Sequence, residues 1–146
     1  RLDLAAAFGA TDTINVERED PVAALNRLTG KRRVDLVFEA AGSDESPALS
    51  MRLAAPAGKI FLVGIPPSDQ IAFSGSVSRR LGLTVYVVRR SRNTLHRTLS
   101  LLERGLLEAD RLVTHRFPLS QCERAFAMAY NYEDNVVKTI IRVPES

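Results

Sequence analysis

The sequence has a single cysteine, two histidines and no apolar run near the roughly 18 to 20 residues that cross a bilayer. The one cysteine, Cys122, cannot form an intramolecular disulfide, which fits a reducing compartment. His96 and His115 have no cysteine at the spacing of zinc ligands, so these residues predict no metal site. Because no signal peptide opens the chain, we expect a cytoplasmic protein that does not associate with membranes.

The commonest phosphate-binding motifs are also missing, since neither a G-x-x-x-x-G-K-[ST] loop nor a G-x-G-x-x-G turn occurs. The charge is mild, with 20 Lys and Arg against 17 Asp and Glu. The basic groups carry no recognition motif and no interleaved aromatic residues, so we expect no nucleic-acid partner. These groups are Arg32-Arg33, Arg79-Arg80 and Arg89-Arg90 with Arg92.

Predicted strands and helices alternate through the first hundred residues. Apolar runs predict strands at residues 13–16, 34–38, 59–64 and 83–88, and the second of these is apolar enough to be covered on both faces. Caps and helical spacing predict helices at residues 1–8, 21–29, 46–53, 77–81 and 94–104, the last capped by Asn93. The alternation predicts an α/β fold with a doubly wound parallel sheet.

The last forty residues differ from the rest. Residues 114–119 are predicted to be an extended connector, and Ser120 to Glu123 match a capping box that begins a helix. Cys122, Phe126 and Ala129 then follow at helical spacing and predict its buried stripe. Residues 136–143 are predicted to close the chain as a strand.

The carboxyl ends of the predicted strands are the candidate binding positions, because ligands in open α/β sheets bind there. They are residues 38–42, 63–66 and 88–90. Gly42 and Gly64 remove side chains where a flat ring or a ribose could approach the backbone. Both glycines also suit ordinary turns, and spacing alone does not separate these two interpretations.

Six short motifs stand in a characteristic order: residues 8–11, 34–42, 58–64, 92–94, 112–119 and 138–141. In this order the sequence resembles the C-terminal part of medium-chain zinc-dependent dehydrogenases, with the sorbitol (L-iditol) or polyol branch nearest. The resemblance implies a partial Rossmann-type sheet whose first β-α-β unit lies upstream of Arg1. It also implies a partial dinucleotide-binding domain at residues 1–110 and a catalytic-domain segment at 111–146, whose helix and strand return to that domain.

The resemblance implies NAD or NADP as cofactor, with NAD favoured. Arg1 and the loop Glu39, Ala40, Ala41 and Gly42 would border the adenosine side. The backbone of Val63, Gly64, Ile65, Val88, Arg89 and Arg90 would face the nicotinamide carboxamide. Arg90 would also be the catalytic-site arginine, which hydrogen-bonds substrate or zinc-bound water. Zinc ligands would come only from an N-terminal domain outside this sequence, so we expect no metal-binding residue here and no activity from this chain alone.

The sequence departs from the family pattern at two of these positions. Ala41 stands where the family has threonine, and residues 87–91 read Val-Val-Arg-Arg-Ser where the family has Gly-x-Phe-Arg-Tyr.

The expected partners are a small alcohol or polyol substrate and further copies of the chain in a homodimer or homotetramer. Two alternatives remain at this point, a methyltransferase-like α/β domain and a non-enzymatic dimerisation module.

Overall fold

The computed structural model describes residues 1–30 and 32–144, which divide into two compact units. The N-terminal unit comprises Leu2 and Leu4–Arg90, and the C-terminal unit comprises Arg1, Asp3 and the chain from Ser91 onward. No helix among the described residues is long and apolar enough to cross a membrane. The expected division at residue 110 concerns domains of a complete enzyme and stays a prediction.

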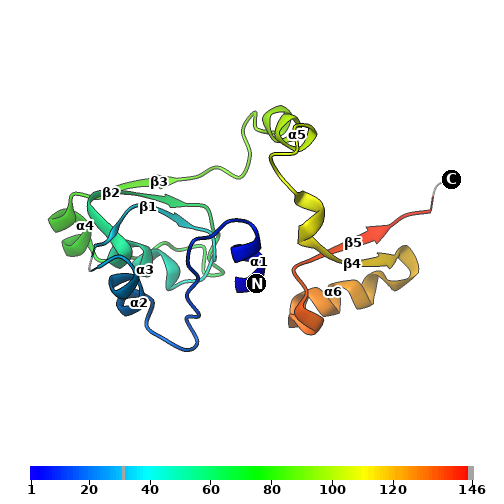
Figure 1. Cartoon of the computed structure of the whole chain (residues 1–146), viewed down its shortest axis with the longest axis horizontal. Coiled ribbons are helices and arrows are strands. Elements are labelled where there is room, and N and C mark those ends of the chain that lie inside the picture. The colour runs from blue at the N-terminus through cyan, green and yellow to red at the C-terminus, as the bar shows by residue number, and fades with distance from the viewer. Residues whose placement is uncertain (31, 145–146) are drawn as a thin grey trace. The chain divides into compact units, whose positions relative to one another are not determined.

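A three-stranded parallel sheet forms the N-terminal unit, with β1 (Val34–Glu39), β2 (Ala54–Leu62) and β3 (Thr84–Val87) side by side in that order (Figure 1). The helices α3 (Ser46–Leu53) and α4 (Gly75–Leu81) connect them. Residues of both helices pack against one core cluster, so both lie on the same face of the sheet. The right-handed rule for parallel crossovers requires this when the strands follow one another in one direction. The predicted parallel α/β fold is therefore confirmed.

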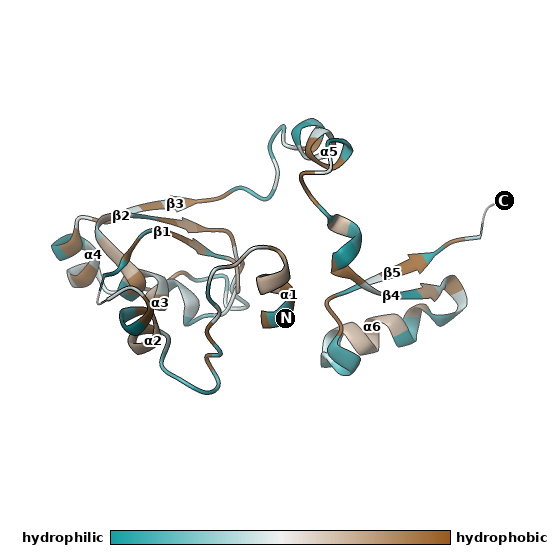
Figure 2. Cartoon of the chain, viewed as in Figure 1, coloured by the Kyte–Doolittle hydropathy of each residue, from teal (hydrophilic) through white to brown (hydrophobic). Residues whose placement is uncertain are grey.

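The core of this unit lies between the sheet and these two helices. Met51 of α3 and Ala54, Ile60 and Leu62 of β2 are buried together. On the opposite face the rings of Phe38, Phe61 and Tyr86 stack in a row, with centroids 4.8 and 4.9 Å apart, and Phe38 is 65% exposed. The prediction that β1 is covered on both faces is therefore wrong for the described residues, because both crossovers cover the same face. The apolar strands in this unit are coloured brown in Figure 2.

Two helices precede the sheet, α1 (Leu2–Ala7) and α2 (Pro21–Leu28), as predicted. The side chain of Asp20 accepts a hydrogen bond from the N–H of Ala23 at 2.8 Å, which caps α2. The strand predicted at residues 13–16 is absent from the described structure. The Asn15 side chain instead accepts the N–H of Glu17 at 2.9 Å, and this local bond turns the chain.

The C-terminal unit is built on a parallel pair of strands, β4 (Val113–Pro118) and β5 (Lys138–Arg142), joined by α6 (Cys122–Asn131). Its core brings together Phe117, Ala125, Met128 and Val136. The segment predicted as an extended connector is thus a strand, because β5 supplies its hydrogen-bonding partner. The predicted closing strand is confirmed in β5. The remaining helical segments are α5 (Leu95–Glu103) and the 3₁₀ turns η1 (Ala109–Leu112), η2 (Leu119–Gln121) and η3 (Glu133–Asn135).

Three local predictions for this unit are wrong. The N-cap of α5 is Thr94 and not Asn93, because Asn93 adopts a left-handed φ of 56°. The capping box does not form, because η2 occupies this stretch and no side chain caps α6. The predicted buried stripe of α6, which included Phe126, is also wrong. Phe126 is 70% exposed, whereas Met128 is buried, so a different side of the helix faces the strands.

Candidate functional site

The side chain of Glu39 closes the carboxyl end of β1 and is only 5% exposed. Its Oε1 accepts hydrogen bonds from the backbone N–H groups of Ala41 and Gly42, both at 2.8 Å, and from the Ser46 hydroxyl at 2.7 Å. Its Oε2 accepts the N–H of Gly64, which follows β2, at 3.1 Å. One carboxylate therefore joins the loop after β1 to the loop after β2, and we call these the 40–42 loop and the 63–65 loop.

These hydrogen bonds also decide the charge of Glu39. Burial removes the carboxylate from water and by itself raises the pKa of Glu39. The hydrogen bonds from Gly42, Ser46 and the other two donors outweigh burial and hold the pKa below its usual value. Glu39 is therefore ionised at neutral pH, and its charge is stabilised by backbone dipoles and a hydroxyl.

The two glycines lie where the loops touch. A Cβ added to Gly64 would stand 2.4 Å from the Gly42 nitrogen and 2.6 Å from Glu39 Oε2. Gly42 has a left-handed φ of 67°, and a Cβ there would lie 3.1 Å from the backbone of Ile65. The two loops therefore meet backbone to backbone, and this close approach requires glycine at position 64.

Apolar and basic residues surround this contact at the ends of the strands. Val63 and Ile65 flank Gly64 and are exposed. Val88 follows the neighbouring strand β3 and is also exposed, although its N–H still bonds to the Leu62 carbonyl at 3.0 Å. Arg89 and Arg90 come next and are exposed. The structure thus brings the predicted 39–42 and 63–65 positions together, and residues 88–90 follow the adjacent strand.

Arg1 has its contacts in the C-terminal unit. Its guanidinium lies over the ring of Tyr132, 4.7 Å from the centroid, and its Nη2 donates to the Val136 carbonyl at 3.5 Å. These contacts stabilise the chain around Tyr132, which has a left-handed φ of 56°. The expected role of Arg1 beside the adenosine end of a cofactor stays a prediction.

Two features of this edge were not predicted. Ser46 was expected only to begin a helix, yet its hydroxyl bonds to Glu39. The Ser68 hydroxyl also donates to Asp44 Oδ1 at 2.6 Å, which joins the two stretches of chain that follow these loops. A sequence signal exists for the first feature, because a carboxylate that ends an apolar strand must find donors nearby.

The histidines have structural surroundings. His115 is mostly buried, with Nε2 3.1 Å from Asp134 Oδ2 and Nδ1 2.9 Å from the Thr114 hydroxyl. His96 lies exposed on α5. Nowhere in residues 1–30 and 32–144 do three His, Cys, Asp or Glu side chains cluster as metal ligands would.

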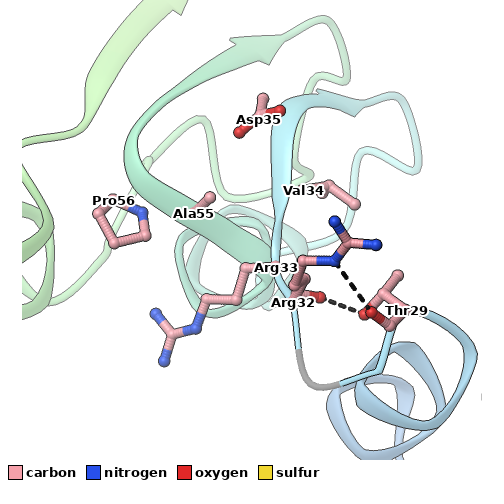
Figure 3. A pocket seen from close by; sticks show the side chains of 7 residues that line it. All are labelled: Thr29, Arg32, Arg33, Val34, Asp35, Ala55 and Pro56. Carbon is pink, nitrogen blue, oxygen red and sulfur yellow. Dashed lines mark hydrogen bonds between the residues drawn. The ribbon is translucent and has the colours of Figure 1, made fainter.

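A surface pocket of about 670 Å³ lies at the other end of β1, where that strand begins (Figure 3). The Arg32 side chain there bonds to the Thr29 carbonyl at 3.4 Å, and Arg33 and Asp35 also line the pocket. Ligands of parallel α/β sheets bind at the carboxyl ends of strands, so this pocket is not the candidate site.

Comparison with known proteins gives the family context. Residues 1–104 match the profile of a family described as zinc-binding dehydrogenase. L-threonine 3-dehydrogenase from Bacillus licheniformis is 33% identical over 88% of this chain and 38% of its own length. Sorbitol dehydrogenase from Bacillus subtilis is 26% identical over 97% of this chain and 40% of its own length.

A solved structure gives the same picture for the fold. The alcohol dehydrogenase TADH from Thermus sp. ATN1 superposes with a TM-score of 0.88 and 27% identity, over 98% of this chain and 42% of that protein. This chain thus spans about two fifths of the length of the proteins that it matches. Threonine and sorbitol dehydrogenases both stand among its relatives, so the expected polyol branch is not distinguished from the others.

Proposed function

Because this chain belongs to the zinc-binding dehydrogenase family, we propose that it forms the cofactor-binding part of an NAD-dependent alcohol or polyol dehydrogenase. This family membership excludes the methyltransferase-like alternative. The observation that carries the proposal is the backbone contact between Gly42 and Gly64 at the carboxyl ends of β1 and β2. The two glycines leave the backbone bare where the loops meet, at the edge of the sheet at which dinucleotides bind in this fold class.

The residues around this contact have suitable chemistry for a dinucleotide. Val63, Ile65 and Val88 are exposed apolar side chains at the strand ends, and such side chains suit the flat face of a nicotinamide ring. The loop of Glu39, Ala40, Ala41 and Gly42 would border the adenosine side. Bound NAD would accept a hydride from the carbon that carries the hydroxyl group.

Arg90 would act on the substrate in this scheme. It is exposed beyond the end of β3. A guanidinium presents a planar fork of donors, which suits adjacent hydroxyl groups of a polyol. We propose that Arg89 only borders the cofactor, whereas Arg90 donates to a substrate hydroxyl. Zinc would have to be held by ligands outside the described residues.

The proposed assembly is a homodimer or homotetramer. Among the described residues β3 is one of the two edge strands of its sheet, β1 being the other, and Val87 on β3 is 75% exposed. An unpaired strand edge with exposed apolar side chains favours pairing with another copy. Light scattering on the purified protein should therefore give a mass of two or four chains. The single cysteine supports the proposed cytoplasmic location.

Cofactor binding by the protein produced from the complete gene tests the proposal directly. We expect NADH to bind with a micromolar Kd, about −8 kcal/mol, and more tightly than NADPH. Titration calorimetry with both cofactors measures this preference. Absence of binding to either would contradict the proposed function, and equal binding would contradict only the preference for NAD. For residues 1–146 alone we expect a millimolar Kd or weaker, because they contain no glycine-rich pyrophosphate turn.

A further inference from the structure

The carboxylate of Glu39 has its acceptor positions directed into the protein. Three backbone N–H groups and one hydroxyl bond to it, at distances between 2.7 and 3.1 Å. The side chain is 5% exposed. A cofactor at this edge would contact the loops around Glu39 and not its carboxylate. A direct contact with the cofactor therefore does not explain why a charged residue stands at this position.

The two oxygens of Glu39 serve different loops. Oε1 bonds to Ala41, Gly42 and the Ser46 hydroxyl, all on the side of the 40–42 loop. Oε2 bonds only to Gly64, in the 63–65 loop. The carboxylate is therefore a rigid link with one end on each loop, and its planar geometry sets their separation.

The Gly64 nitrogen is held especially firmly. Its N–H lies 2.9 Å from the Glu39 carbonyl and 3.1 Å from Glu39 Oε2, so backbone and side chain of one residue share the same donor. The Val63 N–H also donates to the Glu39 carbonyl, at 2.8 Å. A change at Oε2 therefore alters the orientation of Gly64 while the backbone bonds keep the sheet intact.

We propose that Glu39 is a positioning residue: its carboxylate sets the separation between the 40–42 loop and the 63–65 loop, and the latter determines affinity for the nicotinamide half of the cofactor. This inference rests on the proposed function, in which the two loops border the adenosine and nicotinamide ends. It assigns Glu39 no contact with the cofactor.

Glu39→Gln affects the two ends of this link differently. An amide oxygen can still accept the three donors around Oε1, whereas the amide NH₂ would face the Gly64 N–H, and two donors repel. We expect the affinity for NADH to fall about tenfold, because the variant loses part of the free energy that a hydrogen bond to a charged group contributes. The affinity for ADP-ribose, which lacks nicotinamide, should stay within about twofold of wild type, because the 40–42 loop on the adenosine side keeps its hydrogen bonds to residue 39.

Ser46→Ala acts on the other oxygen. It removes the hydroxyl donor to Oε1 and leaves the bond between Oε2 and Gly64 in place. We expect NADH and ADP-ribose to weaken equally, by about three- to tenfold, because loss of one hydrogen bond loosens the adenosine-side loop that both ligands share. The matched control is Ser50→Ala, since the buried Ser50 hydroxyl donates its hydrogen bond to the Ser46 carbonyl, at 2.9 Å, and not to the Glu39 carboxylate.

Calorimetric titration of the complete gene product with NADH and with ADP-ribose tests the inference. Selective loss of NADH affinity in Glu39→Gln, with the Ser50→Ala control unchanged, supports it. Equal losses for both ligands, or no loss, would overturn it. If Glu39→Gln does not fold, Ser46→Ala decides, and unchanged affinities in that variant overturn the inference. Wild-type protein that binds neither ligand would instead contradict the proposed function.

Discussion

Substitution of Gly64 by alanine tests whether the two loops meet as closely as their backbones indicate. The new Cβ would stand 2.4 Å from the Gly42 nitrogen and 2.6 Å from Glu39 Oε2. Ordinary contacts lie near about 3.5 Å, so the loops must separate by roughly 1 Å. The bond from the Gly64 N–H to Oε2, now 3.1 Å, then exceeds hydrogen-bonding distance.

The expected cost follows from those two effects. Loss of a hydrogen bond to a charged group costs about 1.5 to 3 kcal/mol, and overpacking costs about 1 to 3 kcal/mol. Because separation of the loops relieves part of the overpacking, we expect Gly64→Ala to lower the free energy of unfolding by about 3 kcal/mol. With a urea m value of about 2 kcal/mol/M, the midpoint falls by about 1.5 M.

Urea unfolding followed by far-UV circular dichroism measures this shift. Gly75→Ala is the matched control, because Gly75 begins α4 and a Cβ there meets nothing within 4 Å. This control should leave stability unchanged or raise it by up to about 1 kcal/mol. If the two variants unfold within about 0.5 kcal/mol of each other, the close contact at Gly64 is refuted.

Three further predictions concern charge, capping and the substrate. Because hydrogen bonds hold the pKa of Glu39 below its usual value of 4.5, its ionised form contributes stability above that pH, which is lost as the pH falls through the lowered pKa. Glu39→Gln should therefore flatten the acid dependence of urea unfolding below pH 4.5, and an unchanged slope would count against the predicted ionisation. Asp20→Ala should lower the free energy of unfolding by about 1 kcal/mol, since it removes the cap of α2, and denaturation that matches wild type would contradict this role. Arg90→Ala in the complete enzyme should reduce kcat/KM by roughly 30- to 150-fold and Arg89→Ala far less, whereas equal losses below about threefold would remove Arg90 from the substrate site.

The sequence by itself determined the elements whose signals are local. Asp20 followed by proline marks the start of α2, and the side chain of Asp20 caps the helix as predicted. The apolar runs of β1, β2 and β3 and their alternation with helices predict a parallel sheet, which the structure confirms. The order of the motifs also predicts the dehydrogenase family, which the match to residues 1–104 confirms.

Local signals failed where a partner distant in the chain decides the conformation. Residues 13–16 have strand-like side chains, but the described chain gives them no pairing strand, and Asn15 forms a turn instead. Residues 114–119 read as a connector, yet residues 115–118 of this stretch pair with β5 and belong to β4. In both cases β-structure depends on a ladder of hydrogen bonds to another segment, which propensity alone does not contain.

Only the tertiary structure decided the nature of the candidate site. The sequence left Gly42 and Gly64 equally compatible with turns and with a close backbone approach, and the folded chain brings their backbones into contact. It likewise showed Glu39 as one loop residue among several, whereas folding surrounds its carboxylate with four donors from three separate segments. A residue's partners across the chain determine its hydrogen bonds and its charge, and those partners are set only when the parallel strands align their ends.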